Sequence, residues 1–318
     1  MSTPLSLFLG LIGLVILTYG ADLLVKGGVR IAETLGIPSV SIGLTLVSFA
    51  TSAPELVVSV QAALKGSGDI SLGNVVGSNI CNTALILGTA AVITPLTVHR
   101  KMLRFDTPVL VVVSLLLLLF IAVAHGIGRL QALLLLLLFG VYMGKHIRDA
   151  LKGKEAPSEE IPEFKRPLPI WQASLLVLLG LAGLVGGAKL FVNGAVTLAR
   201  LFQVSDAVIG LTIVSVGTSL PELATSAVAA LRKENDIAVG NVVGSNIFNI
   251  LAILGIAPLV RPIQAVGIHT VDLAAMAGVT ILMLGMAYTG KSIRRWEGGV
   301  LLLCYAAYLV WLVFHAGA

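Results

Sequence analysis

The chain has 318 residues, of which 57% are hydrophobic and 12% are charged, and its formal net charge is +5. Soluble domains carry about 25% charged residues, because their whole surface faces water. The composition therefore predicts an integral membrane protein and excludes a disordered chain, a disulfide scaffold and a soluble two-domain enzyme. We attribute the excess of lysine and arginine to membrane topology and not to nucleic-acid binding.

Ten apolar segments are long enough to cross a bilayer as helices, which takes about 20 residues each. Their approximate limits are 5–25, 37–64, 70–95, 107–125, 129–147, 171–191, 207–231, 237–259, 272–290 and 297–315. No basic residue precedes the first segment, so we expect a spanning helix and not a cleaved signal peptide. The second and third segments are long and carry polar residues, which predicts that they are bent or broken. The hydrophilic, proline-containing stretch 148–169 is predicted to be a cytoplasmic linker.

The basic residues predict the orientation of these segments. With the N-terminus outside, 16 of the 21 lysine and arginine residues fall in cytoplasmic loops. Cytoplasmic loops are the ones that accumulate positive charge, so we expect both termini outside and a multi-pass protein of a cell (inner or plasma) membrane. Cys81 and Cys304 both lie in apolar segments, which predicts neither a disulfide nor a thiolate metal site.

An internal repeat is the strongest pattern in the chain. Residues 43–88 and 210–255 align without a gap at an offset of 167, with 28 identities in 46 positions. The sequence therefore predicts two copies of a five-helix unit, at 1–147 and 170–318, joined by the linker. Because five is odd, the second copy starts on the opposite side of the membrane. Two inverted repeats in an all-α membrane protein are typical of secondary transporters, although duplication can also simply build a stable bundle.

Two acids stand apart from the rest. Fourteen of the sixteen aspartate and glutamate residues lie in loops or near the ends of spans, whereas Glu55 and Glu222 lie deep within them at equivalent positions. A carboxylate at the centre of a bilayer costs at least about 2.5 kcal/mol. Such a pair requires a cation, protons or a water-filled cavity, unless each acid is neutralised separately for structural reasons.

Hydroxyl groups accompany each glutamate on one helical face. Their spacing of three or four residues is the same in both repeats, at Thr45, Ser48, Ser52 and Ser59 and at Thr212, Ser215, Ser219 and Ser226, with Thr51 and Thr218 just off this face. A lone hydroxyl more often bonds the carbonyl four residues earlier, which is the structural alternative for each member. Pro54 and Pro221 precede the glutamates. Each removes a backbone donor and so leaves carbonyls near Ser48–Ala50 and Ser215–Gly217 that can face a cation, with a packing kink as the alternative.

The third and eighth segments contribute the sequences GNVVGSNICN and GNVVGSNIFN. Ser78 and Asn82 share a helical face, as do Ser245 and Asn249, and we expect these amides to reach the glutamates. The other four asparagines are expected to point elsewhere and to bond the backbone at helix ends or breaks; they are Asn74, Asn79, Asn241 and Asn246.

All candidate ligands are oxygen atoms, which disfavours soft transition metals. Calcium takes six to eight oxygen ligands in flexible geometry, and sodium is also a hard cation. The two carboxylates carry a formal charge of −2, which balances one calcium ion or two sodium ions.

At these residues the sequence resembles the calcium/cation antiporter superfamily. The match lies in its alpha-repeats, here GLTLVSFATSAPEL and GLTIVSVGTSLPEL, each followed by GNVVGSN, and extends more loosely to the ten-helix layout. The compact prokaryotic sodium/calcium exchangers are the most similar branch. The resemblance implies Glu55 and Glu222 as central ligands. It also implies ligating roles for Thr51, Thr218, Ser52, Ser219, Ser78, Ser245, Asn82 and Asn249, and for the carbonyls of Ser48 and Ser215.

The resemblance implies a secondary antiporter, and not an enzyme, that expels calcium against sodium entry with three sodium ions per calcium. Asn249 stands where potassium-dependent members carry an aspartate, which favours the potassium-independent branch. A calcium/proton exchanger, a potassium-dependent exchanger and, from another class, a cation channel are the alternatives. We expect calcium, sodium and the lipid bilayer as partners, no nucleic acid, no resident cofactor and a functional monomer.

Overall fold

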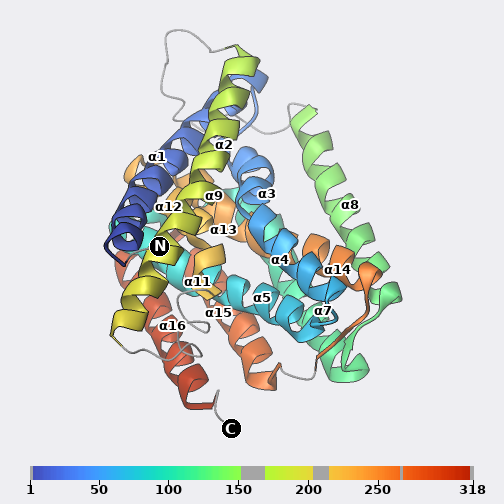
Figure 1. Ribbon diagram of the computed structural model, residues 1–318. Coiled ribbons are helices and arrows are strands. Elements are labelled where there is room, and N and C mark those ends of the chain that lie inside the picture. Colours follow the sequence, from blue (N-terminus) through green and yellow to red (C-terminus); the bar gives the residue numbers. More distant parts are fainter. Residues whose placement is uncertain (1–2, 152–168, 203–214, 266–267, 316–318) are drawn as a thin grey trace.

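A computed structural model describes residues 3–151, 169–202, 215–265 and 268–315 (Figure 1). Helices dominate it, and the strands are two residues long. The predicted all-α membrane class is confirmed: seven helices in the described part are long and apolar enough to cross a membrane, or eight if one bent pair counts as a span. Most of the predicted linker and residues 207–214 of the seventh predicted segment lie outside the described residues.

The first half contains α1, a bent helix, a long third helix and two outer helices. Its elements in chain order are α1 (Thr3–Leu35), α2 (Ser39–Ile42), π-helical η1 (Gly43–Val47), α3 (Ser48–Thr51), α4 (Ala53–Leu64), α5 (Gly68–Ile80), π-helical η2 (Cys81–Ile86), α6 (Leu87–Ile93), β1 (Leu96–Thr97), π-helical η3 (Met102–Asp106), α7 (Thr107–Ala124), β2 (Gly126–Ile127) and α8 (Arg129–Leu151). The last helix extends four residues into the stretch that we assigned to the linker.

The second half follows the same order. Its elements are α9 (Ile170–Leu201), α11 (Ser215–Thr218), α12 (Leu220–Leu231), α13 (Asn235–Phe248), π-helical η5 (Asn249–Ile253), α14 (Leu254–Val260), β3 (Ile263–Gln264), α15 (Thr270–Gly290), β4 (Ser292–Ile293) and α16 (Arg295–His315). The described part of each predicted segment is mainly helical; the exceptions are Ile37, Pro38, Ser52, Thr94, Pro95, His125 and Ser219.

The predicted bend in the second segment is confirmed. Ser52 leaves helical geometry at φ −85° and ψ 2°, and the helices on either side of it meet at 46°. Pro54 lies in the first turn of α4, where the missing N–H has no helical partner to lose. Ser219 has nearly the same geometry before α12, at φ −89° and ψ 8°.

The prediction of a break in the third segment is wrong. Residues 68–93 form one continuous 26-residue helix, in which Cys81–Ile86 is π-helical. Its counterpart, residues 235–260, has the same construction with its π-helical turn at Asn249–Ile253. A π-helical turn accommodates the polar residues by changing the phase of the side chains without ending the helix.

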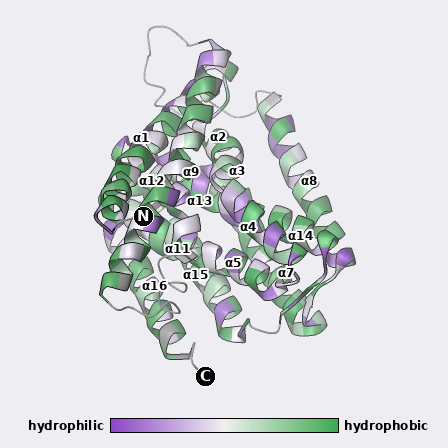
Figure 2. Ribbon diagram, viewed as in Figure 1, coloured by the Kyte–Doolittle hydropathy of each residue, from purple (hydrophilic) through white to green (hydrophobic). Residues whose placement is uncertain are grey.

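Burial divides the helices into a core and a periphery. The most apolar window of residues 235–260 is 89% buried, whereas that of residues 129–150 in α8 is only 22% buried. Figure 2 shows apolar residues over the outer helices, including α1 and α8. The exposed apolar side chains of α7 and α8, such as Val123 and Leu130, therefore suit a lipid environment.

Helices α1 and α9 cross with their backbones in contact (Figure 1). A Cβ built on Gly187 would lie 2.5 Å from the Leu17 nitrogen, and one on Gly180 would lie 2.6 Å from the Leu24 nitrogen. Gly10 of α1 lies against Gly194 of α9, and from there higher residue numbers in α1 lie against lower residue numbers in α9. The two helices are therefore antiparallel. Small residues permit this close approach.

Short β-strands of the two halves also pair with each other. β1 pairs antiparallel with β4 through Leu96 and Ile293, and β2 pairs antiparallel with β3 through Gly126 and Gln264. In each half, one short strand follows the third helix and one follows the fourth. The strand after the third helix of one half therefore pairs with the strand after the fourth helix of the other half. These pairs join the two halves at both ends of the bundle.

We predict that Gly187→Val lowers the free energy of unfolding by about 1–3 kcal/mol, because the added atoms would overlap the backbone of α1. Gly186→Val is the matched control, since a Cβ at the neighbouring Gly186 has no atom within 4 Å. Thermal unfolding in detergent measures both variants. Equal melting temperatures for the two would contradict the backbone contact between α1 and α9.

Candidate ion-binding site

The two predicted acids lie at equivalent places in the core. Glu55 is in the first turn of α4 and Glu222 in the first turn of α12, and both side chains are fully buried. The breaks at Ser52 and Ser219 give each glutamate the start of a new helix in the interior. A helix N-terminus favours negative charge, which offsets part of the burial cost of a carboxylate.

Each glutamate is held by a serine of the other half. Ser52 Oγ donates to Glu222 Oε1 at 2.9 Å, and Ser219 Oγ donates to Glu55 Oε1 at 3.1 Å. Ser219 also lies 3.3 Å from Ser78 Oγ. The repeats therefore form one shared site and not two independent ones.

Among the candidate glutamates and asparagines, four buried oxygen atoms accept no hydrogen bond from the described residues. They are Glu55 Oε2, Glu222 Oε2, Asn82 Oδ1 and Asn249 Oδ1. Buried polar atoms without a partner are uncommon in folded proteins. These atoms come in two equivalent pairs, one from each half, which is the arrangement expected of ligands for a cation that lies between the repeats.

The positions of these amides are fixed by two further asparagines. Asn82 Nδ2 donates to Asn246 Oδ1, and Asn249 Nδ2 donates to Asn79 Oδ1, both at 3.0 Å. Asn246 Nδ2 donates in turn to Thr83 Oγ1 at 2.7 Å. The expectation that Asn79 and Asn246 point away from the site is thus wrong, although Asn79 does donate to the backbone oxygen of Asn246. These bonds leave the oxygen atoms of Asn82 and Asn249 available.

Asn74 and Asn241 behave as predicted and bond the backbone at the breaks. Asn74 Nδ2 donates to the carbonyl oxygen of Glu55 at 3.3 Å and to Ser59 Oγ at 3.0 Å. Asn241 donates to the carbonyl oxygen of Glu222 and to Ser226 Oγ at the same two distances. Each amide therefore supports the helical turn that carries a glutamate.

The remaining candidates divide into two groups. Thr51 Oγ1 donates to Asn241 Oδ1 at 3.0 Å and lies 3.5 Å from Ser245 Oγ, and the Ser48 carbonyl accepts from Ser245 Oγ at 3.4 Å. The side chains of Thr45 and Ser48 instead bond carbonyls four residues earlier, at 2.6 and 2.8 Å. For these two hydroxyls the structural alternative holds, and Ser48 faces the site through its carbonyl.

On the other half, Thr218 ends α11 and Ser215 begins it. The side chain of Ser215 and the whole of Thr212 lie outside the described residues. Within the described ranges, no group of three or more histidine, cysteine, aspartate or glutamate residues is arranged to hold a metal ion. The donor set there is two carboxylates with hydroxyl, amide and carbonyl oxygens, which suits hard cations.

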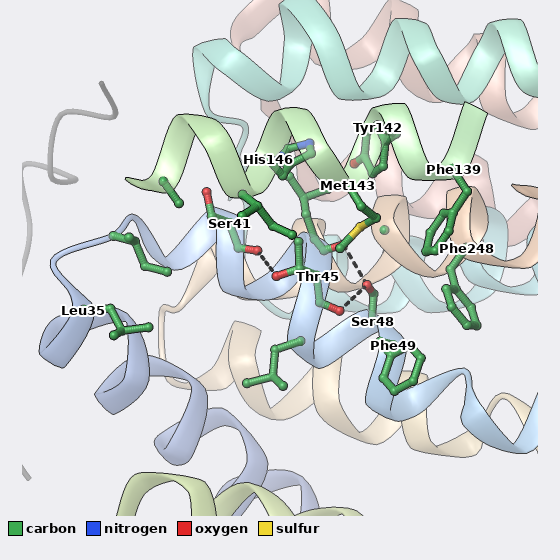
Figure 3. A pocket seen from close by; sticks show the side chains of 16 residues that line it. Leu35, Ser41, Thr45, Ser48, Phe49, Phe139, Tyr142, Met143, His146 and Phe248 are labelled. Atoms are coloured by element: carbon green, nitrogen blue, oxygen red, sulfur yellow. Dashed lines mark hydrogen bonds between the residues drawn. The ribbon is translucent and has the colours of Figure 1, made fainter. Parts of the chain in front are cut away.

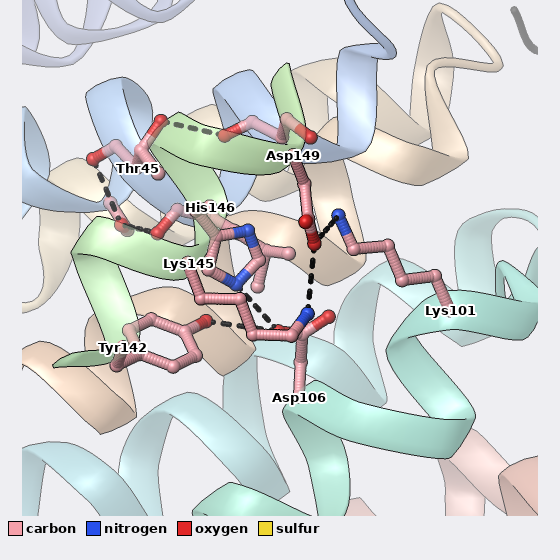
Figure 4. A network of polar contacts seen from close by, with 10 residues as sticks. Thr45, Lys101, Asp106, Tyr142, Lys145, His146 and Asp149 are labelled. Atoms are coloured by element: carbon pink, nitrogen blue, oxygen red, sulfur yellow. Dashed lines mark hydrogen bonds and ion pairs between the residues drawn. The ribbon is translucent and has the colours of Figure 1, made fainter. Parts of the chain in front are cut away.

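A buried cluster that the sequence did not reveal joins the end of η3, just before α7, to α8 (Figure 4). Asp106 Oδ1 lies 2.8 Å from His146 Nε2 and 3.2 Å from the Tyr142 hydroxyl. The Tyr308 hydroxyl donates to Asp272 in the same way between α15 and α16 at 2.9 Å. In both pairs the aspartate and the tyrosine are 36 residues apart, and this shared spacing is the sequence pattern that could have indicated them. We interpret both pairs as structural ties within the outer helices.

A cavity of about 600 Å³ separates α2, η1 and α3 from α8 (Figure 3). Its lining is largely apolar, with Phe49, Phe139 and Phe248 at one end and Tyr142 and His146 on α8. Ser48 lines this cavity, and its carbonyl oxygen also accepts the hydrogen bond from Ser245 Oγ in the candidate site. The apolar lining distinguishes the cavity from the oxygen-lined site.

The sequence profile of the sodium/calcium exchanger protein family matches residues 5–145 and 173–314. The chain belongs to this family. The putative antiporter CaxA of Alkalimonas amylolytica is 42% identical over 307 residues, which cover 94% of this chain and 95% of that protein. The sodium/calcium exchanger MaX1 of Methanosarcina acetivorans is 36% identical over 342 residues, covering 96% and 97%.

Solved structures of the sodium-calcium exchanger NCX_Mj have the same fold. The crystal soaked with zero Na⁺ and Ca²⁺ gives a TM-score of 0.84 at 32% identity, covering 98% of this chain and 100% of that chain. The crystal soaked with 10 mM Na⁺ and 10 mM Sr²⁺ gives 0.83. The predicted resemblance is confirmed. The present chain is a transmembrane antiporter of the compact prokaryotic sodium/calcium exchanger type.

We predict that Asn246→Ala lowers the free energy of unfolding by about 1–3 kcal/mol, because the buried groups of Asn82 and Thr83 would lose their partner. Asn193→Ala makes the same chemical change on the exposed surface of α9 and serves as the control. Thermal unfolding in cation-free detergent solution measures the difference. An Asn246 variant as stable as the Asn193 variant would contradict the asparagine network.

Proposed function

We propose that this exchanger expels calcium across a cell membrane in exchange for sodium, by alternating access and with net movement of charge. One observation carries the proposal. Two fully buried glutamates, from equivalent positions of the two repeats, each have one oxygen bonded to a serine of the other repeat and one oxygen that has no hydrogen-bond partner among the described residues. Family membership and the named sodium/calcium exchangers among its relatives support the choice of ions.

The same proposal includes ten spans arranged as two inverted five-helix repeats. The antiparallel crossing of α1 and α9 supports it, since these are the first helices of the two repeats. The reciprocal pairing of β1 with β4 and of β2 with β3 supports it as well. Inverted repeats with broken helices at the bilayer midplane place an ion site where either side of the membrane can reach it.

Charge balance explains how the two ions would compete. Glu55 and Glu222 together offer −2, which one calcium ion neutralises, and the neighbouring hydroxyl and amide oxygens complete its ligand shell. Sodium ions would use the same carboxylates, so calcium and sodium exclude each other. The family resemblance implies three sodium ions per calcium, and each cycle would then move one net positive charge.

Protons or potassium are the alternative coupling ions. Two buried carboxylates can also return in protonated form, which would make the chain a calcium/proton exchanger. Asn249 supplies an amide and not a third carboxylate, which favours potassium independence. We propose a functional monomer in an inner or plasma membrane, with both termini outside and no resident cofactor.

We predict that Glu222→Gln reduces sodium-driven calcium uptake by about 100-fold or more, since the variant removes half of the charge that binds calcium. Radioactive calcium uptake would be measured in sodium-loaded proteoliposomes diluted into sodium-free buffer at matched pH. Glu297→Gln is the control, because Glu297 is also buried but bonds the backbone nitrogen of Arg294 at the start of α16.

Acceleration of uptake by an inside-positive potential would support electrogenic exchange, because three sodium ions would leave for each calcium ion that enters. Uptake that ignores the sodium gradient but follows an imposed pH or potassium gradient would replace the coupling ion. Wild-type uptake by Glu222→Gln would remove the assignment of the site.

A further inference from the structure

An ion pair joins the first helix of the first repeat to a helix of the second repeat. Asp22 of α1 forms an ion pair with Arg232, the residue that caps the C-terminal end of α12. Lys26 bonds the second oxygen of Asp22 at 2.7 Å. Because α12 begins beside Glu222, this contact connects α1 with the far end of a helix that carries an ion ligand. We call Asp22 and Arg232 the gate ion pair.

The repeat offset places lysines at both corresponding positions. Residue 189 of α9 corresponds to Asp22, and residue 65, which caps α4, corresponds to Arg232; both are lysine. The turns themselves match. Gly66 and Lys233 both have positive φ, at 79° and 62°, and the preceding caps bond the helix carbonyls in the same pattern. The difference between the two ends therefore lies in the side chains.

The packing is asymmetric in the same sense. α1 packs directly against α12, whereas α9 has no comparable packing against α4 within the described residues. We refer to this arrangement, in which α1 lies against α12, as the state closed at the α1–α12 end. With the orientation predicted from the basic residues, this end is cytoplasmic.

Exchange of the two repeat conformations describes the opposite state of an inverted-repeat transporter. α1 would then leave α12, and α9 would pack against α4. That movement breaks the pair between Asp22 and Arg232 and brings Lys65 toward Lys189. The Asp22–Arg232 attraction therefore stabilises the observed state, and the Lys65–Lys189 repulsion destabilises the opposite state.

We propose that the gate ion pair, opposed by the two lysines, biases this exchanger toward the state closed at the α1–α12 end. The inference rests on the proposed alternating-access function. Asp22 and Arg232 act on the conformational equilibrium and not on the ion ligands. Breaking the pair should therefore increase the population of the opposite state.

Cross-linking measures that population without any transported ion. Lys65→Cys and Lys189→Cys would be introduced together after both native cysteines are replaced by alanine. Disulfide formation would be started with a mild oxidant. The remaining free thiols would be labelled with a maleimide-polyethylene glycol, which slows the migration of the protein on a gel, and the loss of labelling with time gives the rate. Cross-linking occurs only when α9 approaches α4.

Asp22→Asn or Arg232→Gln should raise this rate about two- to fivefold, the range expected for a partly exposed ion pair. The double variant Asp22→Arg with Arg232→Asp should return it to the starting value. Glu33→Gln is the control, since it breaks the Arg30–Glu33 pair, whose two members both belong to α1.

An unchanged rate after Asp22→Asn, or an equal rise after Glu33→Gln, would overturn the inference. Failure to cross-link in every variant would also overturn it, because Lys65 and Lys189 would then not approach each other. If cross-linking follows the expected pattern while sodium-driven calcium uptake is absent, the proposed ions are wrong and the gate ion pair stands.

Discussion

The burial of two like-charged carboxylates in the interior of a membrane protein is the constraint on which the rest of the structure depends. Glu55 and Glu222 are fully buried and would repel each other if both were ionised without a counter-ion. The breaks at Ser52 and Ser219 give each acid a helix N-terminus, and the crossed serine bonds satisfy one oxygen of each. The other oxygen of each accepts no hydrogen bond from the described residues and is where the proposed cation would bind.

The sequence predicted the parts of this arrangement that are local. The offset of 167 and the two prolines were sufficient to find the glutamates, the serines before them and the bend, because those features repeat within a few residues. The roles of Asn79 and Asn246 were missed for a geometric reason. A regular period of 3.6 residues directs them away from the site, whereas the π-helical turns that follow change the phase.

Contacts between distant segments were also beyond the sequence. Asp106 lies close to a predicted span end, so nothing in the local pattern indicates that it is buried against Tyr142 and His146. The reciprocal strand pairs depend on how the halves are placed in space. Because the chain is duplicated, an interaction formed in one repeat can nevertheless be compared with the equivalent position in the other repeat. Divergence between counterparts, as at His146, then marks where the two halves have acquired different tasks.

The glycine-lined crossing of α1 and α9 has a mechanical consequence. Where backbones touch directly, no long side chain is available to change rotamer and absorb a displacement. A force applied to either helix is therefore transmitted to the other with little compliance, and the two behave as a single rigid lever. Motion that opens a path at one end of such a lever necessarily obstructs the path at the other. Mutual exclusion of the two openings would then follow from stiffness alone and would need no signal from one side of the membrane to the other.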